Sequence, residues 1–321
     1  MTIGSHNCPS CHVTNVAPLW QSGSAQGFAL VQCRGCSLVS THPWPSDEQL
    51  AIAYRSEYYG QRNARFWPPL EKLVRRLRQR RAAKLSRPCK PGRALDIGCG
   101  RGWTLAALRD EGWQVRGVEL HEHAARHAVD ELKIDVDIGG FEPARYEAES
   151  FDAIILWHVL EHVRDPLQTL DGIARLLKPG GVLAVAVPNR ASWQACVTRY
   201  AWFHLDLPRH LWHFSADQLG KLLHQRGLTI VDQSFTSPEQ NPFGWVQSLL
   251  NQLGFKHNLL YDLIRSRAAR QVQQPWRSHP FQSLVSVMLG AMLLPWAFAM
   301  LLPEWWFGSG ATVEIYARRD K

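Results

Sequence analysis

The chain has 321 residues, of which 45% are hydrophobic and 20% are charged, and its formal net charge is +8 at pH 7. This is ample for one catalytic domain with appendages, and the basic balance favours anionic partners such as nucleic acid, lipid headgroups or an acidic substrate. Seven Cys, four of them in two CxxC pairs, argue against a disulfide framework and for a metal site in a reducing compartment. The N-terminus has no basic segment followed by an apolar run, so we expect no secretory signal.

Residues 1–45 are predicted to form a small zinc-binding module. The two pairs are Cys8-Pro-Ser-Cys11 and Cys33-Arg-Gly-Cys36. Four thiolates at this spacing can surround one tetrahedral Zn²⁺, which would leave no open position and would make the metal structural. A segment this short needs the metal to fold. The spacing does not say whether the module contacts the acceptor, a partner or the rest of the chain.

Residues 46–91 are predicted to form a helical linker or lid. Ser46 followed by Gln49 has the spacing of a capping box, which starts a helix. A second helix is expected after Pro68, and it carries an Arg-rich stretch over 72–84. That stretch suits either a solvated helix face or contact with phosphates.

Residues 92–238 alternate strand and helix signals. The apolar strand segments are ALDIG, QVRGVEL, IDVDI, FDAIILW and GVLAVAVP, and the helical segments between them include 103–111, 122–132 and 166–177. Strands this apolar, separated by helices, predict a parallel sheet covered on both faces. Ser215 with Gln218 then marks another helix start, Gly227 a stop, and LTIVDQSF a further strand.

The first of these strands runs into a glycine-rich turn with an acidic residue before it. Asp96 precedes glycines at 98, 100 and 102, and a helix is expected from Trp103. Glycines there let the backbone turn sharply and approach a ligand, which would lie at the carboxyl ends of the strands. The dinucleotide fingerprint needs Gly at 103, and a P-loop needs a Lys-Ser/Thr pair, so neither is present. An acid before the turn suits a cationic amino-acid ligand, and Glu119 at the end of the next strand can accept both hydroxyls of a ribose.

The segments LDIGCGRG and GVEL resemble the class I S-adenosylmethionine-dependent methyltransferases. FDAIILWHVLEHVRDP and LLKPGGVLAVAVPN also resemble the fourth- and fifth-strand motifs of that family, so the likeness covers 92–238 and 311–319. It implies an α/β fold with a doubly wound, Rossmann-like sheet of seven mostly parallel strands, the last antiparallel. In this chain the fold would carry the zinc module in front and an apolar helical insertion before the last strand, which is expected at the sheet edge.

The resemblance also implies which residues contact the cofactor. These are Asp96, Gly98, Gly100, Gly102, Glu119, Leu120, Phe141, Trp157 and His158. Glu119 would bind the ribose hydroxyls, and Trp157 and His158 would border the methionine part. The family often has an acid near position 140 for the adenine amino group, but this chain has Gly139-Gly140-Phe141 there. Phe141 is expected to pack on the adenine instead.

Methyl transfer to a hydroxyl or an amine needs a base near the acceptor. The best candidates lie in the stretch DLPRHLWHF, which contains His210 and His213 and resembles a subgroup of quinone- and sugar-modifying methyltransferases. Histidine titrates near neutrality, which suits this role, although both residues also suit a structural one. His210 is slightly favoured, whereas Glu161 and His162 are expected to shape the pocket floor.

The insertion at 239–309 contains an uncharged apolar run from Phe281 to Pro303. About 20 apolar residues suffice to span a bilayer. A single span conflicts with a final strand at 310–321 that must return to the same sheet, and Pro295 would break or kink a helix. We therefore expect two short helical halves that dip into a membrane or lie on it, with a dimer interface or a core cap as the alternative. The expected interfacial residues are Trp296, Trp305 and Trp306, and the expected headgroup contacts are Arg265, Arg267, Arg270 and Arg277.

Together these features predict a methyltransferase that uses S-adenosylmethionine and contains structural Zn²⁺. Its acceptor would be a small, lipid-linked, quinone-like or glycan-precursor molecule, and it would lie at the cytoplasmic face of a membrane. The alternatives are a zinc-module RNA methyltransferase of the rRNA type and a non-catalytic scaffold that keeps the fold.

Overall fold

A seven-stranded sheet forms the centre of the molecule in the computed structural model, which describes residues 8–14, 16–20, 27–54, 68–265 and 274–321. Its strands are β4 (Arg93–Ile97), β5 (Gln114–Glu119), β6 (Val136–Ile138), β7 (Phe151–Trp157), β8 (Leu177–Pro188), β9 (Leu228–Ser234) and β10 (Thr312–Arg319). They lie in the order β6-β5-β4-β7-β8-β10-β9. The pairs from β6 to β8 are parallel, and β10 is antiparallel to both of its neighbours. The predicted fold class is confirmed.

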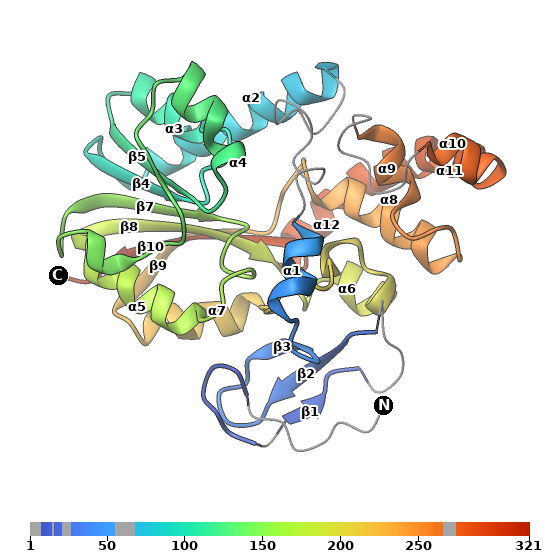
Figure 1. Cartoon of the computed structure of the whole chain (residues 1–321), viewed down its shortest axis with the longest axis horizontal. Helices are drawn as coiled ribbons and strands as arrows, with labels where there is room; N and C mark the ends of the chain where they lie inside the picture. The colour runs from blue at the N-terminus through green and yellow to red at the C-terminus, as the bar shows by residue number, and fades with distance from the viewer. Residues whose placement is uncertain (1–7, 15, 21–26, 55–67, 266–273) are drawn as a thin grey trace.

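Helices cover both faces of this sheet, so the strands are apolar on both sides. These helices are α2 (Pro68–Leu85), α3 (Trp103–Asp110), α4 (Glu122–Arg126), α5 (Pro166–Leu176) and α7 (Ala216–His224), with short helical turns at η3 (His127–Glu131) and η4 (Pro143–Arg145). Figure 1 shows α2, α3 and α4 above the sheet, and α5 and α7 below it. The carboxyl ends of the parallel strands therefore meet along one open edge, where a ligand can bind.

The final strand differs from expectation in its place. β10 is not an edge strand, because it lies between β8 and β9. Residues 312–317 are buried, with Ile315 packed in the cluster on one face of the sheet and Tyr316 in the cluster on the other. β9 is the edge strand and is exposed over most of its length. The last strand of the chain is therefore an internal strand of the core.

Two predicted helix starts differ in how fully they form. Ser46 and Gln49 make both bonds of a capping box at the start of α1 (Asp47–Ala53). At α7, Ser215 accepts from the backbone N–H of Gln218, but the Gln218 side chain donates to the carbonyl of Ser37. That residue therefore links the catalytic domain to the N-terminal module.

The N-terminal module contains a three-stranded antiparallel sheet. Its strands are β1 (Val16–Pro18), β2 (Ala29–Cys33) and β3 (Val39–His42), paired in that order. It lies below the main sheet, next to α6 (Trp193–Thr198) and the loops that follow the central strands (Figure 1). Leu38 packs in the same cluster as the main-sheet core, so the module is attached to the catalytic domain by buried contacts.

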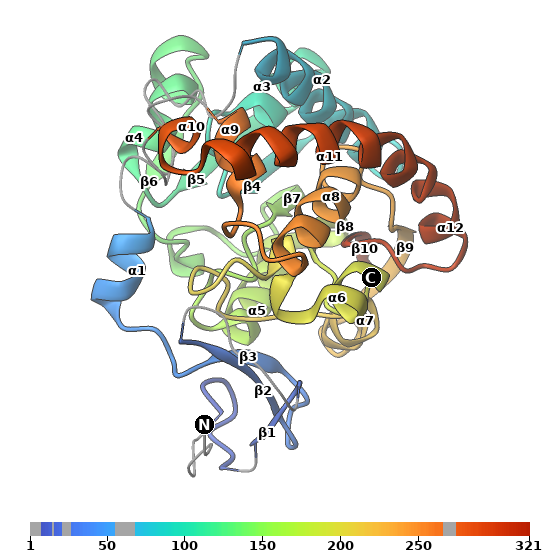
Figure 2. The same cartoon turned by 90° about the vertical axis from the view of Figure 1, so that its right-hand side faces the viewer.

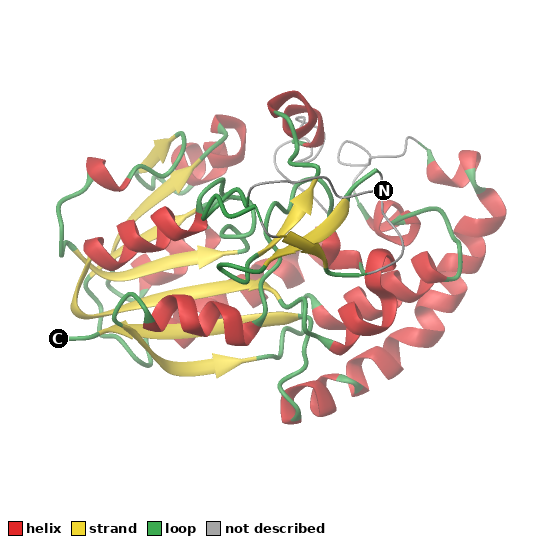
Figure 3. Cartoon of the chain, turned by 90° about the horizontal axis from the view of Figure 1, so that it is seen from below, coloured by secondary structure: helices red, strands yellow, loops and turns green. Residues whose placement is uncertain are grey.

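The insertion before β10 forms a separate group of helices at one end of the sheet (Figures 2 and 3). Short helical turns η5 (Arg199–Ala201) and η6 (Phe203–Leu205) lead toward it, and its helices are α8 (Asn241–Gln252), α9 (Leu259–Ile264), α10 (Pro275–Ser278), α11 (Pro280–Ala299) and α12 (Leu301–Trp306). The predicted division at Pro295 is wrong, because α11 continues through that residue and ends at Ala299. Proline lacks only one helical donor, and the apolar run on both sides favours a continuous helix.

Small residues face inward on α11 and large apolar residues face outward. The buried positions are Ser283, Ser286, Gly290 and Ala297. A side chain at Gly290 would meet Leu260 of α9 at 2.8 Å, so the two helices pack closely. Phe281 is 76% exposed and Met292 is 66% exposed. Within the described residues, Pro280–Trp306 is the one helical stretch long and apolar enough to cross a membrane.

A buried carboxylate joins the last helix of this insertion to its first helix and to α6 of the catalytic domain. Glu304 of α12 is fully buried, and it accepts hydrogen bonds from Asn241 (2.9 Å), Trp245 (2.7 Å) and Gln194 (3.3 Å). Burial raises the pKa of Glu304, and the three donors oppose that rise. The network joins α12 to α8 and α6, so α12 is anchored next to the sheet.

We expect Glu304→Ala to destabilise the protein by about 3 kcal/mol, because it leaves buried donors of Asn241 and Trp245 without an acceptor. Denaturant unfolding followed by circular dichroism measures this. Trp305→Ala is the matched control, since that side chain is more than half exposed on the same helix. Equal unfolding free energies for the two variants would contradict the anchoring role.

Candidate active site

A cavity of about 920 Å³ opens at the carboxyl ends of the parallel strands. Its walls include the loop after β4, the end of β5 and the end of β7. Leu50 of α1 and Tyr54 just after it reach the cavity, and Asn258 and Tyr261 reach it from the insertion. This volume is at the upper end for a ligand pocket, so it suits a cofactor together with a second molecule.

The glycine turn after β4 forms one side of the cavity. Gly98, Gly100 and Gly102 all have positive φ (77°, 51° and 74°), which favours glycine. A side chain at Gly98 would also meet Val159 at 2.4 Å, whereas at Gly100 nothing lies within 4 Å. The backbone at Gly100 is therefore open to the cavity, as close approach to a ligand requires.

Glu119 lies opposite this turn at the end of β5. The backbone N–H of Gly100 donates to its Oε2 at 3.0 Å, and the N–H of His121 donates to its Oε1 at 3.2 Å. Burial raises the pKa of Glu119, while these backbone hydrogen bonds lower it. A nearly buried carboxylate, held by two backbone donors and lining a cavity, fits a ligand that offers hydroxyl donors.

The structure brings most of the predicted site residues to the cavity. The residues that line it are Gly98, Gly100, Glu119, Leu120, Phe141, Trp157, His158 and His210. Three others do not line it: Asp96 is buried in β4, Gly102 packs against Ala128, and His213 is buried on the side of the N-terminal module. Gly139 and Gly140 also border the cavity, so no acidic side chain is present at the predicted adenine position.

Arg81 of α2 is a cavity residue that the sequence did not single out. Its guanidinium lies 4.3 Å from the ring centroid of Trp157 and pairs with Glu239. In the sequence it is one of several basic residues within 72–84, and their spacing alone did not show which would face the cavity. The fixed guanidinium can bind a carboxylate or another anion at this end of the cavity.

His158 and Glu161 form a hydrogen-bonded pair after β7. Nδ1 of His158 lies 3.3 Å from Oε1 of Glu161. Burial raises the pKa of Glu161. The hydrogen bond from His158 and the charge interactions with His162 and His158 lower it by more, so the pKa is about 2. The carboxylate is therefore ionised and can only accept, so Nδ1 of His158 carries the proton.

The other ring nitrogen of His158 is then the basic one. Nε2 of His158 is buried and has no hydrogen-bond partner among the described residues. The residue also has a left-handed backbone (φ 56°), a strained conformation that the surrounding structure must impose. His158 lines the cavity, and an imidazole whose Nδ1 is held by a carboxylate and whose Nε2 has no hydrogen-bond partner can act as a general base.

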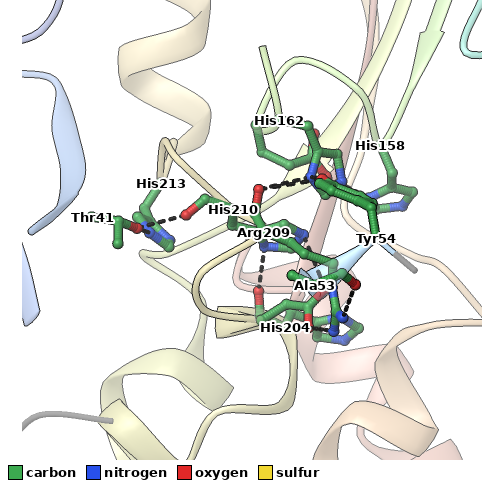
Figure 4. A network of polar contacts seen from close by, with 11 residues as sticks. Thr41, Ala53, Tyr54, His158, His162, His204, Arg209, His210 and His213 are labelled. Atoms are coloured by element: carbon green, nitrogen blue, oxygen red, sulfur yellow. Dashed lines mark hydrogen bonds and ion pairs between the residues drawn. The ribbon is translucent and has the colours of Figure 1, made fainter. Parts of the chain in front are cut away.

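His210 is oriented in a similar way by a backbone carbonyl. Its Nδ1 lies 2.9 Å from the carbonyl of His204, which can only accept, so Nδ1 carries the proton (Figure 4). Its Nε2 lies 3.8 Å from Asp206. Burial and the nearby His162 lower the pKa of His210 to about 4, although Asp206 and Glu161 oppose this. His210 is therefore neutral at pH 7 and a weak base.

His213 faces the N-terminal module instead of the cavity. The Thr41 hydroxyl donates to the carbonyl of His210 at 2.6 Å, so its single proton is used (Figure 4). The hydroxyl must then accept from Nε2 of His213, 3.0 Å away. Burial lowers the pKa of His213 well below its usual value. The structure therefore assigns the ring a hydrogen bond to Thr41 and does not bring it to the cavity.

The described residues contain two groups whose spacing can hold a metal ion. Ligand atoms of Cys8, Cys11, Cys33 and Cys36 lie within 4.8 Å of one another, as the spacing of the two CxxC pairs predicted. The Sγ atoms of Cys8 and Cys36 are 3.6 Å apart, and those of Cys11 and Cys33 are 3.5 Å apart. These separations are close to the edge of about 3.8 Å of a tetrahedron with Zn–S bonds of about 2.3 Å.

The second group lies in the cavity and consists of Glu161, His162 and His210. Nδ1 of His162 lies 3.0 Å from the carbonyl of Arg209 and 2.7 Å from the hydroxyl of Tyr54, which follows α1. Because the carbonyl of Arg209 can only accept, Nδ1 of His162 carries the proton. Only its Nε2 is then left to ligate a metal ion. The group can hold a cation or share a proton.

Comparison with known proteins adds four findings. A family profile described as a methyltransferase domain matches residues 66–233. The chain is 35% identical over 167 residues to a ubiquinone biosynthesis O-methyltransferase of Dinoroseobacter shibae, covering 48% of this chain and 66% of that protein. It is 30% identical over 192 residues to the Xanthomonas campestris pv. campestris protein of the same name, covering 57% and 72%. A solved structure of a putative sarcosine dimethylglycine methyltransferase from Galdieria sulphuraria shares the fold, with a TM-score of 0.50, 15% identity, and coverage of 85% and 98%.

Proposed function

Since the chain belongs to the class I S-adenosylmethionine-dependent methyltransferases, we propose that it methylates a hydroxyl oxygen of a small, quinone-like or lipid-linked acceptor at a membrane surface. The observation that carries the proposal is that a single cavity is lined by two sets of residues. One is the Gly98–Gly100 turn with Glu119, and the other is the His158–Glu161 pair. The oxygen acceptor is inferred from the relatives, which are named O-methyltransferases.

The residues around the turn fit the cofactor. Glu119 would accept the ribose hydroxyls, and the open backbone at Gly100 would lie against the nucleoside. Phe141 would pack on the adenine where the usual acid is missing. Arg81, held by Glu239, is placed to bind the carboxylate of the methionine part.

When bound, the cofactor supplies a methyl group already activated by its positively charged sulfur. The protein therefore has to align the acceptor oxygen and remove its proton. We assign the proton to Nε2 of His158, with Glu161 stabilising the resulting imidazolium. His210 is the second candidate, but its lowered pKa makes it the weaker base.

The proposed test measures S-adenosylhomocysteine formation with phenolic and quinol acceptors, first in buffer depleted of Mg²⁺ without a chelator, so that the Cys group keeps its metal, and then with added Mg²⁺. Turnover without added Mg²⁺ supports the assignment to His158. A rate that depends on Mg²⁺ would assign the group of Glu161, His162 and His210 to a cation instead. Methylation of RNA but not of any small acceptor would favour the alternative of a zinc-module RNA methyltransferase.

The exposed face of α11 and α12 supports the membrane part of the proposal. Phe281, Met288 and Trp306 are each more than 60% exposed on the described part of the insertion. Glu304 anchors α12, and β10 follows it directly, so a helix lying on the cytoplasmic face fits better than one that spans. Trp305 and Trp306 suit the interface, and Trp296 is partly exposed although it also packs on Trp245.

The predicted headgroup contacts need one correction. Arg265 is fully buried, where it pairs with Asp262 and lies over the ring of Tyr261, so it does not reach a surface. Arg277 is exposed next to α11. Arg267 and Arg270 lie outside the described residues.

We expect the protein to sediment with vesicles of phosphatidylcholine and phosphatidylglycerol, and a triple change of Phe281, Met288 and Met292 to Asn to lower the bound fraction at least tenfold. Burying each of these apolar side chains in the membrane contributes about 1.5–3 kcal/mol to binding, and the change to Asn removes that contribution. Val197→Asn with Ile230→Asn is the matched control, because these exposed apolar residues lie on α6 and β9. Equal vesicle binding by both variants would refute the membrane face.

A further inference from the structure

The N-terminal module is joined to the acceptor loop as though that loop were one more strand of its sheet. The N–H of Thr41 donates to the carbonyl of Leu211 at 3.0 Å, and the N–H of His213 donates to the carbonyl of Val39 at 2.9 Å. Ser40 and Trp212 form an antiparallel bridge between these two bonds. Residues 211–213 therefore extend the order β1-β2-β3 by a short fourth strand.

Side chains strengthen the same contact, and most of them are buried. The Thr41 hydroxyl holds the carbonyl of His210 and the ring of His213 (Figure 4). Trp44 packs edge-on against Trp212 at a centroid distance of 5.4 Å. Thr41 is only 1% exposed, so its hydroxyl has no access to water that could replace these partners.

This short strand is also hydrogen-bonded to Glu161, the partner of the proposed base His158. The N–H groups of Leu211 and Trp212 donate to the carbonyl of Glu161 at 2.8 and 3.2 Å. Glu161 in turn orients His158. Hydrogen bonds thus run from β3, through 211–213, to the backbone carbonyl of Glu161, the residue whose carboxylate orients the proposed base.

We propose that the N-terminal module is the structural support of the acceptor loop and of Glu161, with Thr41 as the positioning residue that connects them. The inference rests on the proposed function, because it concerns the same cavity. The module in turn depends on its four Cys: β2 ends at Cys33, and β3 begins three residues after Cys36. Removal of the Zn²⁺ that these four thiolates would hold is therefore expected to release β3, and with it the loop at 206–214.

The first test compares Thr41→Val with Thr41→Ser in the full-length protein. Valine keeps the shape and removes the hydroxyl, whereas serine retains it. We expect Thr41→Val to lower kcat about tenfold with unchanged affinity for S-adenosylhomocysteine, and Thr41→Ser to restore most of the rate. Arg34→Ala, an exposed position of the same module, is the matched control and should resemble the wild type.

The second test does not depend on turnover. Hydrogen–deuterium exchange is measured before and after a chelator removes Zn²⁺, with the metal content determined in parallel. We expect faster exchange in peptides covering 39–42 and 206–214, and no change at β4 and β5, where the cofactor turn lies. Restored protection on adding Zn²⁺ would exclude irreversible unfolding.

Two results would overturn the inference: an unchanged kcat in Thr41→Val, or unchanged exchange at 206–214 after the metal is lost. Should Thr41→Val fail to fold, the exchange experiment on the wild type decides alone. Absence of S-adenosylhomocysteine binding in every variant, including the wild type, would instead refute the proposed function, while the exchange result would still test the support.

Discussion

Glu119→Ala is expected to weaken binding of S-adenosylmethionine and S-adenosylhomocysteine by ten- to a hundredfold. The substitution removes a carboxylate that two backbone N–H groups hold at the cavity wall. Hydrogen bonds to a charged acceptor contribute about 1.5–3 kcal/mol, and 1.4 kcal/mol corresponds to a factor of ten. Isothermal titration calorimetry measures the change directly.

Glu122→Ala is the matched control, because Glu122 is exposed one turn further along the chain. The pH dependence gives a second check. Burial raises the pKa of Glu119, so the carboxylate is lost at a higher pH than for a free glutamate. Affinity for S-adenosylhomocysteine should therefore fall on acidification, starting above the ordinary glutamate range, and should be constant in Glu119→Ala. If Glu119→Ala bound S-adenosylhomocysteine as tightly as the wild type does, Glu119 would not bind the ribose.

His158→Ala is expected to lower kcat by about 10²–10⁴ with little change in affinity for the cofactor product. General-base catalysis contributes a factor of this size, and His158 lines the cavity and has an Nε2 without a hydrogen-bond partner among the described residues. Glu161→Gln should give a smaller loss, because the amide keeps the shape but no longer stabilises the imidazolium. Steady-state rates with a saturating acceptor measure both.

His210→Ala provides the comparison that decides between the two histidines. If His158 accepts the proton, His210→Ala retains most of the rate and spares cofactor binding. If the losses are reversed, the proton goes to His210, whose pKa of about 4 would then appear as the acid limb of the pH–rate profile. Retained activity in both variants would show that neither ring is the base.

The cofactor half of the site could be predicted from the sequence because its residues are adjacent in the chain. Gly98, Gly100 and Glu119 follow directly from two strands, and backbone conformation places them. Parallel strands that are neighbours in the sheet end at the same edge, so their terminal residues meet. The four Cys were predictable for a similar reason, since two short turns bring each pair together.

The acceptor half could not be predicted in this way. Tyr54 and His158 follow α1 and β7, and Arg81, at the cofactor end of the cavity, comes from α2, so no spacing in the sequence relates them. Which nitrogen of His158 or His210 is free depends on the hydrogen bonds of Glu161 and His204, and these exist only in the folded chain.

Local patterns therefore determined the elements of this protein: its strands, most of its helix starts, the cofactor turn and the Cys cluster. Only the tertiary structure decided that β10 lies inside the sheet, that α11 passes through Pro295, and that residues 211–213 pair with β3. Backbone propensity acts over a few residues, whereas burial and cross-strand hydrogen bonds depend on segments far apart in the chain. The same physical difference separates His210, which reaches the cavity, from His213, which bonds to Thr41.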